Sequence, residues 1–164
     1  MLLNLLFAVV LVVATVAIHA VGLDALLRGL IRSQALDRSG FRPVVGMVIG
    51  LTCWLILIHL VEIAIWGLFY CWQGCLPDAE SAVYFSAVTY TTVGYGDLVL
   101  TKAWRIFAPL EALTGILMCG LSTGLFFALV TQWHSNWVRR RNELELQAAP
   151  PSKTEPSTTL NRNK

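Results

Sequence analysis

The sequence predicts an all-α membrane protein. Of its 164 residues, 56% are hydrophobic and only 13% are charged, and the mean hydropathy of +0.65 lies outside the balance of soluble domains of this length. Residues 1–23 carry no charge, residues 43–77 carry only Glu62, and residues 106–138 carry only Glu111. Each stretch has at least the roughly 20 residues that a helix needs to cross a bilayer. The formal net charge of +2 gives no reason to expect a nucleic-acid partner.

Residues 1–23 form the first predicted element, a transmembrane helix. A cleaved signal peptide is the alternative, because the sequence AIHA at residues 17–20 loosely resembles a small-residue cleavage site. The stretch lacks the positive start of a signal peptide and runs past twenty residues. We therefore favour a retained membrane helix.

Residues 24–42 link the first two spans, and we expect this linker to be cytoplasmic and amphipathic. Its apolar residues recur at helical spacing: Leu23, Leu26, Leu27, Leu30 and Ile31. A helix with this pattern can lie on the inner leaflet of the membrane. A cytoplasmic extension of the first span fits the pattern equally well.

Arginines predict the orientation of the chain. Four lie between the first two spans and three follow the last span, namely Arg28, Arg32, Arg38, Arg42, Arg139, Arg140 and Arg141. Because cytoplasmic loops are enriched in positive residues, we expect a multi-pass protein of the cell membrane with its N-terminus outside and its C-terminus in the cytoplasm. The tail, residues 139–164, is rich in Pro, Ser, Thr and charge, which predicts disorder.

A short helix is predicted between the second and third spans. Pro77 precedes Asp78, a favourable N-cap, and Glu80 adds negative charge to the first turn, so a helix should begin at residue 79. Residues 79–90 are too few to cross a bilayer and suit a re-entrant segment. The sequence TTVGYGD follows at residues 91–97. Non-helical backbone at membrane depth must be buried in protein or line a water-filled cavity.

Residues 92–96, TVGYG, resemble the selectivity filter of potassium channels. The resemblance covers residues 43–134, within a pore domain that we place at 43–138. It implies an outer helix over 43–71, a pore helix over 79–90, a filter over 91–97 and an inner helix over 106–134, with the N-terminal helix as an addition. One filter strand cannot surround an ion, so the resemblance implies a cyclic homotetramer.

By this resemblance, the filter backbone binds potassium. The residues concerned are Thr92, Val93, Gly94, Tyr95 and Gly96, and the carbonyl oxygens of the first four, with the Thr92 hydroxyl, would bind K+. These oxygens would replace a hydration shell whose loss in a low-dielectric interior costs on the order of tens of kcal/mol. For successive carbonyls to point one way, alternate residues need conformations that Gly94 and Gly96 accept at little steric cost. Val93 and Tyr95 are expected to point away from the ion and pack against pore helices.

Three residues are expected to support the filter: Thr91, Asp97 at the outer mouth, and Glu111. Some members of the family carry a glutamate in the pore helix that interacts with the aspartate after the filter, but this chain has Val88 at that position. We therefore expect the coupling to be absent. Glu111 either accepts hydrogen bonds from the pore helix or extends toward the basic residues that precede the inner helix.

Glycines in the last span have two interpretations. Gly115 and Gly120 fall where the inner helix of the family lines the cavity and bends, so they are candidate gating hinges. Close helix packing is the alternative. We favour it for Gly120, because Gly120 and Gly124 form a GxxxG pair. For Gly115 both interpretations stay open.

Other polar residues have weaker functional signals. His59 and Glu62 lie three apart and share a helix face, which favours a structural hydrogen-bonded pair over a proton sensor. Cys71 and Cys75 should lie outside, either as a disulfide or as free thiols. Their CxxxC spacing alone is a weak metal signal.

The predicted function is passive, potassium-selective conduction through a tetrameric pore. The alternative is an accessory subunit of a heteromeric cation channel. No cluster of nucleophile, base and oxyanion donor indicates an enzyme, and no cofactor is expected beyond K+ as the permeant ion. The expected partners are membrane lipid, K+ and further copies of the chain.

Overall fold

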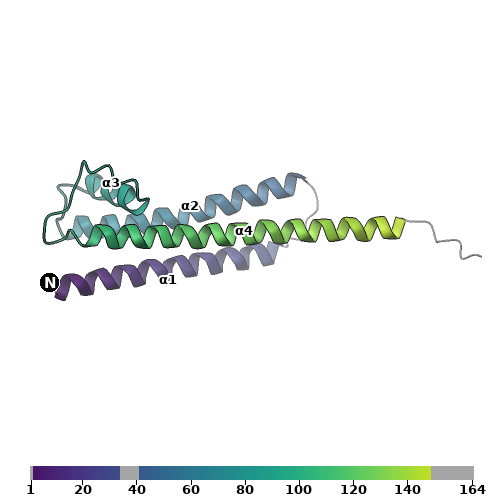
Figure 1. Ribbon diagram of the computed structural model, residues 1–164, viewed down its shortest axis with the longest axis horizontal. Helices are drawn as coiled ribbons and strands as arrows, with labels where there is room; N and C mark the ends of the chain where they lie inside the picture. Colours follow the sequence, from purple (N-terminus) through teal and green to yellow (C-terminus); the bar gives the residue numbers. More distant parts are fainter. Residues whose placement is uncertain (1, 34–40, 149–164) are drawn as a thin grey trace, which may run out of the picture.

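Four helices make up the part of the chain that the computed structural model describes, residues 2–33 and 41–148 (Figure 1). They are α1 (Leu2–Ser33), α2 (Phe41–Trp72), α3 (Ala79–Tyr90) and α4 (Phe107–Ala148). Three segments, Leu3–Ser33, Val44–Trp72 and Phe107–Gln147, are long and apolar enough to cross a membrane. Within these ranges the chain has no strand. The predicted all-α membrane fold is confirmed.

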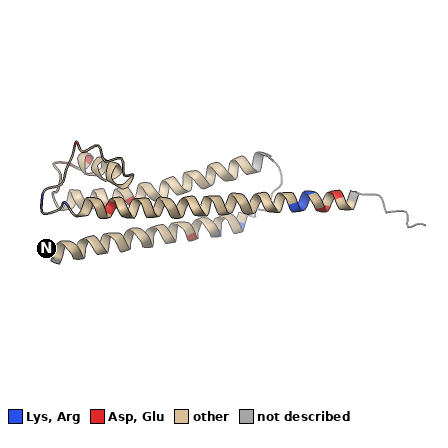
Figure 2. Ribbon diagram, viewed as in Figure 1, with Lys and Arg blue, Asp and Glu red and all other residues tan. Residues whose placement is uncertain are grey.

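The three long helices lie along one another, and α3 sits at one end of the bundle. α1 packs against α2 and α4, and α3 packs against the same two helices. Figure 1 shows the N-terminus at the end that carries α3, whereas α4 leaves the bundle at the other end. At the first end, Asn4 Nδ2 donates a hydrogen bond of 3.1 Å to the carbonyl oxygen of Ala103. Figure 2 shows basic residues gathered toward the two ends and a middle that is almost free of them.

α1 continues into the predicted linker without a break and ends at Ser33. In this part, Leu26 is buried together with Leu51 and Leu55 of α2 and Leu129 of α4, and Leu23 and Leu30 pack against this group. Leu27 and Ile31 stay exposed. Asp24 and Arg28, on the exposed side, form an ion pair of 2.8 Å. A separate helix does not form over residues 24–33, and the first helix continues through them instead, as in the alternative interpretation. Residues 34–40 lie outside the described part.

α4 extends well beyond the predicted end at residue 134, to Ala148. The prediction of disorder from residue 139 is wrong for residues 139–148. Helix-favouring residues run through this stretch, and Arg141 and Glu145 form an i,i+4 ion pair of 3.0 Å. The Pro- and Ser-rich sequence that motivated the prediction begins later, and residues 149–164 lie outside the described part.

α3 begins where its capping residue predicts. The carboxylate of Asp78 accepts the backbone N–H of Ser81 at 2.8 Å and the Ser81 hydroxyl at 3.0 Å. The backbone N–H is the main reason that the pKa of Asp78 lies below its usual value. On the other side of the helix, Ala82, Phe85, Ser86 and Tyr90 are buried.

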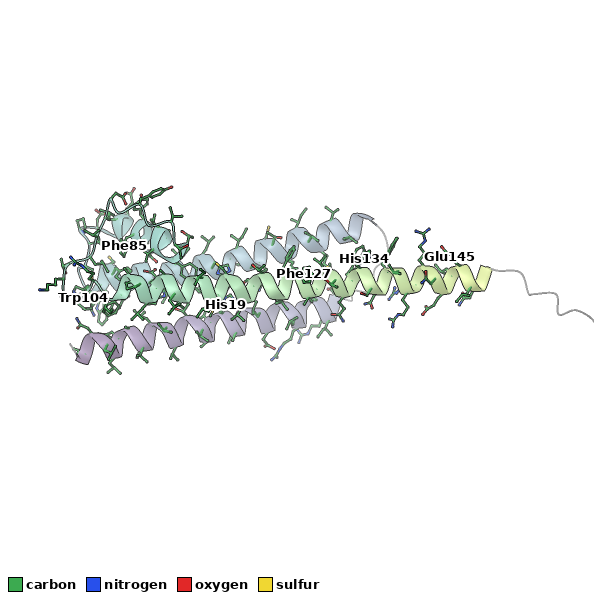
Figure 3. The ribbon with its side chains drawn as sticks, in the orientation of Figure 1. His19, Phe85, Trp104, Phe127, His134 and Glu145 are labelled. Atoms are coloured by element: carbon green, nitrogen blue, oxygen red, sulfur yellow. The ribbon has the colours of Figure 1, made fainter. Side chains whose placement is uncertain are left out.

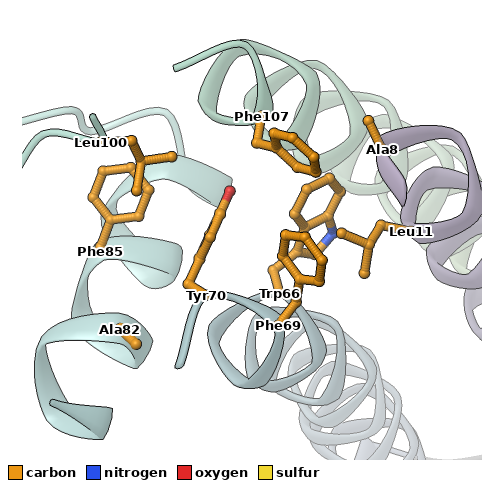
Figure 4. Packing of buried hydrophobic residues seen from close by; sticks show 9 residues of the cluster. All are labelled: Ala8, Leu11, Trp66, Phe69, Tyr70, Ala82, Phe85, Leu100 and Phe107. Carbon is orange, nitrogen blue, oxygen red and sulfur yellow. The ribbon is translucent and has the colours of Figure 1, made fainter. Parts of the chain in front are cut away.

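Aromatic side chains fill the core between α3 and the long helices (Figure 4). Phe69 of α2 stacks on Phe107 at the start of α4, with ring centroids 5.2 Å apart. Tyr70 meets Phe85 of α3 edge to face at 5.3 Å. Such pairs are worth about 0.5–1.5 kcal/mol each beyond the area they bury. The first pair holds α2 against α4, and the second holds α3 against α2.

Two tryptophans of α2 bond to α1. Trp66 is fully buried and donates from Nε1 to Thr15 Oγ1 at 3.0 Å. Trp54, in the middle of the second span, donates to the carbonyl oxygen of Gly22 at 2.9 Å. A Cβ on Gly22 would come within 2.7 Å of Ile58, so the two helices approach closely there. α1 is thus bonded to the bundle along its length.

Thr15→Val is expected to lower the free energy of unfolding by about 1–2 kcal/mol, because it leaves the buried indole N–H of Trp66 without its acceptor. Thermal unfolding in detergent, followed by tryptophan fluorescence, measures the change. Thr123→Val is the matched control, since its exposed hydroxyl bonds only within α4, to Cys119 O. Equal shifts in the two variants would contradict a role for the Thr15–Trp66 bond.

Candidate functional site

The TTVGYGD segment folds back against the end of α3. Three backbone N–H groups donate to carbonyls of the last turns: Thr91 to Ala87 at 3.1 Å, Thr92 to Thr89 at 2.9 Å, and Gly94 to Val88 at 3.1 Å. The Thr91 hydroxyl donates to Ala87 O at 2.6 Å. Thr91 therefore anchors the segment to the helix.

Every second residue of the segment has left-handed backbone. The φ angles are 61° at Thr92, 56° at Gly94 and 78° at Gly96. Glycine adopts this region freely, but threonine does so at a cost of about 1–2 kcal/mol. The sequence suggested the unusual conformation for the two glycines, and Thr92 extends the alternation by one step. Strained backbone of this kind clusters at functional sites.

The segment presents two different faces. Thr92, Gly94 and Gly96 line a groove of about 340 Å³ that is completed by α3 and the first turns of α4. Val93 and Tyr95 do not line it and are 52% and 72% exposed. The expected packing of these two side chains against pore helices is not met within one chain.

Asp97 is bonded to α3 despite the missing glutamate. Its Oδ2 accepts the Tyr84 hydroxyl at 2.8 Å. Tyr84 lies one helical turn before Val88 and so occupies the same side of α3. Val88 indicated the loss of the glutamate partner of Asp97. The replacement by Tyr84 was not predicted, although its four-residue spacing from Val88 could have indicated it.

Glu111 is fully buried behind the segment. Its carboxylate accepts the Tyr70 hydroxyl of α2 at 2.7 Å and the Ser86 hydroxyl of α3 at 2.6 Å. Ser86 also lies 2.8 Å from the carbonyl oxygen of Ile63. This is the first of the two expected arrangements, a carboxylate bonded to the short helix. One residue of α4 thereby ties three helices together.

His59 and Glu62 form the expected pair, with Nδ1 and Oε2 3.3 Å apart, and the pair belongs to a larger group. Three side chains from other helices join them: His19 of α1, Tyr90 of α3 and Ser122 of α4. We call these five residues the His–Glu cluster. Nothing in the local sequence around His19 or Ser122 indicates this partnership.

Gly115 marks the closest approach of α4 to α3. A Cβ at this position would lie 2.1 Å from the carbonyl oxygen of Tyr90 and 2.9 Å from its carbonyl carbon. Close packing is therefore a requirement at Gly115, whether or not the helix also bends there. Gly120 and Gly124 have no atom within 4 Å of such a Cβ in the described chain.

Gly115→Ala is expected to displace the last turn of α3 or α4 and to destabilise the protein by about 1–3 kcal/mol, as overpacking does. The variant Gly124→Ala is the control, because it adds a methyl group in open space of the same helix. Thermal midpoints of the two variants measure the difference. A Gly115→Ala protein as stable as the control would contradict the contact.

One family model, described as ion channel, matches residues 56–132. The match begins in α2, includes α3 and the TTVGYGD segment, and ends within α4. Comparison with curated proteins and with solved structures gives no match. The matched residues contain Tyr70, Tyr84, Ser86, Asp97 and Glu111, which make the supporting contacts described above.

Proposed function

Because residues 56–132 form an ion channel domain within a multi-pass membrane protein, we propose that this chain conducts potassium selectively and passively through a pore shared by four copies. The observation that carries the proposal is the alternation of left-handed backbone at Thr92, Gly94 and Gly96 within the sequence TVGYG. Alternating conformation turns successive carbonyls to one side, as a row of ion ligands requires.

Potassium is the proposed ion because the filter sequence resembles that of potassium channels. The carbonyl oxygens of Thr92, Val93, Gly94 and Tyr95, with the Thr92 hydroxyl, would take the place of water around the dehydrated ion. Gly96 would let the chain turn out of the row toward Asp97. Tyr84, bonded to Asp97, would hold the outer mouth.

Four copies are proposed because a single segment leaves its ion-binding side open. The exposed side chains of Val93 and Tyr95 would pack against neighbouring copies, around the groove that Thr92 and Gly94 line. Exposed apolar side chains continue this surface along α4, including Leu117, Leu121 and Phe127. Gly120 and Gly124, whose Cβ positions have no atom within 4 Å among the described residues, suit close contact between copies.

The proposed location is the cell membrane, with the N-terminus and the filter on the outside. The placement of the N-terminus at the α3 end supports this orientation (Figure 1). The arginines at residues 139–141 lie at the opposite end, where a cytoplasmic excess of positive charge is expected. No enzymatic role and no cofactor are proposed.

Reconstitution tests the function. The full chain, purified and inserted into liposomes, should support a flux driven by a potassium gradient and little flux driven by an equal sodium gradient. Cross-linking of the purified chain in detergent should give a tetramer. Comparable sodium flux would contradict selectivity. A tetramer without any flux at either membrane polarity would favour an accessory subunit, which gains activity only with a second type of chain.

A further inference from the structure

The His–Glu cluster lies inside the bundle, where all four helices meet. His19 and Glu62 are 1% and 0% exposed, and the His59 side chain is 18% exposed. Figure 3 shows His19 in the middle part of the bundle. A polar group at this depth is costly and by default indicates a function.

Three metal-ligating side chains converge in the cluster. Nδ1 of His19 lies 2.9 Å from Glu62 Oε1, and Nδ1 of His59 lies 3.3 Å from Glu62 Oε2. One donor atom from each of the three residues falls within 4.8 Å of the others. Tetrahedral zinc bound at about 2.0–2.1 Å spaces its ligands by about 3.3 Å. Small side-chain movements would thus bring the three donors around one ion.

The far sides of both histidines are already supported. Nε2 of His59 lies 3.1 Å from Ser122 Oγ, and Nε2 of His19 lies 3.3 Å from the same oxygen. A histidine that binds a metal through one nitrogen usually donates a hydrogen bond from the other. The hydroxyl oxygen has two lone pairs, so it can accept both N–H groups at once.

Without a cation, protons alone must satisfy the cluster. Ser122 has a single proton, so it donates to one Nε2 and accepts from the other. The histidine that donates from Nε2 then has, when neutral, a bare Nδ1 against the carboxylate of Glu62. If this histidine is His59, the Tyr90 hydroxyl can donate to its Nδ1 across 3.0 Å, at the expense of its bond to Glu62. A metal ion held between the two Nδ1 atoms and Glu62 satisfies every member.

Other charges do not supply this cation. Among the described residues, the ion pairs of Glu62 are those with His19 and His59, and no Lys or Arg takes part. A divalent ion bound by the Glu62 carboxylate and the Tyr90 phenolate would give a site of zero net charge. Its entry would release the proton of Tyr90.

We propose that the His–Glu cluster binds one divalent metal ion of the zinc class per chain, through His19 Nδ1, His59 Nδ1, Glu62 and the Tyr90 oxygen. Tyr90 is the last residue of α3 and directly precedes Thr91. The ion would therefore fix α1 and the end of α3 to α2. The site is independent of which ion, if any, passes along the TTVGYGD segment.

Cobalt is a suitable probe because Co²⁺ takes zinc sites and absorbs visible light when bound in tetrahedral geometry. The full chain with Cys71→Ser and Cys75→Ser, which removes the thiols at and just after the end of α2, should bind one Co²⁺ in equilibrium dialysis and show that absorption. Added Zn²⁺ should displace the bound Co²⁺ and raise the thermal midpoint by mass action. Loss of a residue that is hydrogen-bonded to a metal ligand typically weakens metal binding by roughly 10–100-fold. His19→Ala removes a ligand itself, so it should weaken Co²⁺ binding by more than that.

The third histidine provides the matched control. His134 is exposed on α4 and lies far along the bundle from His19 (Figure 3), so His134→Ala should bind Co²⁺ as tightly as its parent. His19→Cys keeps a ligand at the site and serves if the alanine variant does not fold. It should add a sulfur-to-cobalt charge-transfer absorption. Failure of the parent to bind Co²⁺ or Zn²⁺, equal losses in His19→Ala and His134→Ala, or no thiolate absorption in a Co²⁺-loaded His19→Cys protein would overturn the proposal.

Discussion

Gly94→Ala is expected to abolish potassium-selective flux while the protein still folds. Gly94 has φ of 56°, a conformation that costs alanine about 1–2 kcal/mol. No atom lies within 4 Å of the added Cβ, so the strain comes from the backbone and not from a clash in the chain. Relief of that strain would rotate the peptide and turn a carbonyl out of the proposed row of ligands. Because about 1.4 kcal/mol is a factor of ten, the strain alone would lower the potassium flux about five- to thirtyfold, and the rotated carbonyl should abolish what remains of the selective flux.

Liposome flux under potassium and sodium gradients measures this loss, and the thermal midpoint shows whether the variant folds. Gly29→Ala is the matched control, since Gly29 lies within α1 and also has open space around its Cβ position. Alanine is favoured over glycine in a helix by about 1 kcal/mol, so this variant should conduct normally. A Gly94→Ala protein that keeps its preference for potassium would show that the left-handed backbone is not needed for selection.

The helices were predictable because their signals are summed over many residues. Apolar runs without charge predict spans whatever the packing, and Asp78 places the start of α3 by a local bond to Ser81. The same logic misplaced the end of α4. The Pro- and Ser-rich composition of residues 149–164 was extended to residues 139–148, which are helical. The linker was misplaced for a related reason, since a leucine stripe shows that one face is covered but not by what.

The contacts of the site were harder to predict, because they join residues far apart in sequence. Helical spacing put His59 and Glu62 on one face, but it carries no information about His19, 43 positions from Glu62. Glu111 stood out as the one charge in an apolar stretch, and its partners Tyr70 and Ser86 depend on how deep α3 sits. The left-handed backbone of Thr92 had no sequence signal, because threonine rarely adopts it. Its backbone N–H is bonded to Thr89 in the turn before it, and a sequence pattern does not show that bond.

Glu111→Leu is expected to lower the free energy of unfolding by about 2–4 kcal/mol. The change leaves the buried Tyr70 hydroxyl without an acceptor, and such a loss costs about 1–3 kcal/mol, more when the acceptor carries charge. Ser86 keeps the carbonyl oxygen of Ile63 as an alternative acceptor, so its hydroxyl should contribute less. α3 would lose its bond to α4, and potassium flux should fall with stability.

A double-mutant cycle with Tyr70→Phe separates this bond from a general effect of the substitution. In the Tyr70→Phe background no hydroxyl is left to be stranded, so Glu111→Leu should cost at least about 1 kcal/mol less there than in the parent chain. Glu143→Leu, at an exposed position of the same helix, should change stability by no more than about 0.5 kcal/mol. If Glu111→Leu costs the same in both backgrounds, the carboxylate does not act through Tyr70, and the junction of α2, α3 and α4 behind the segment must be held by packing alone.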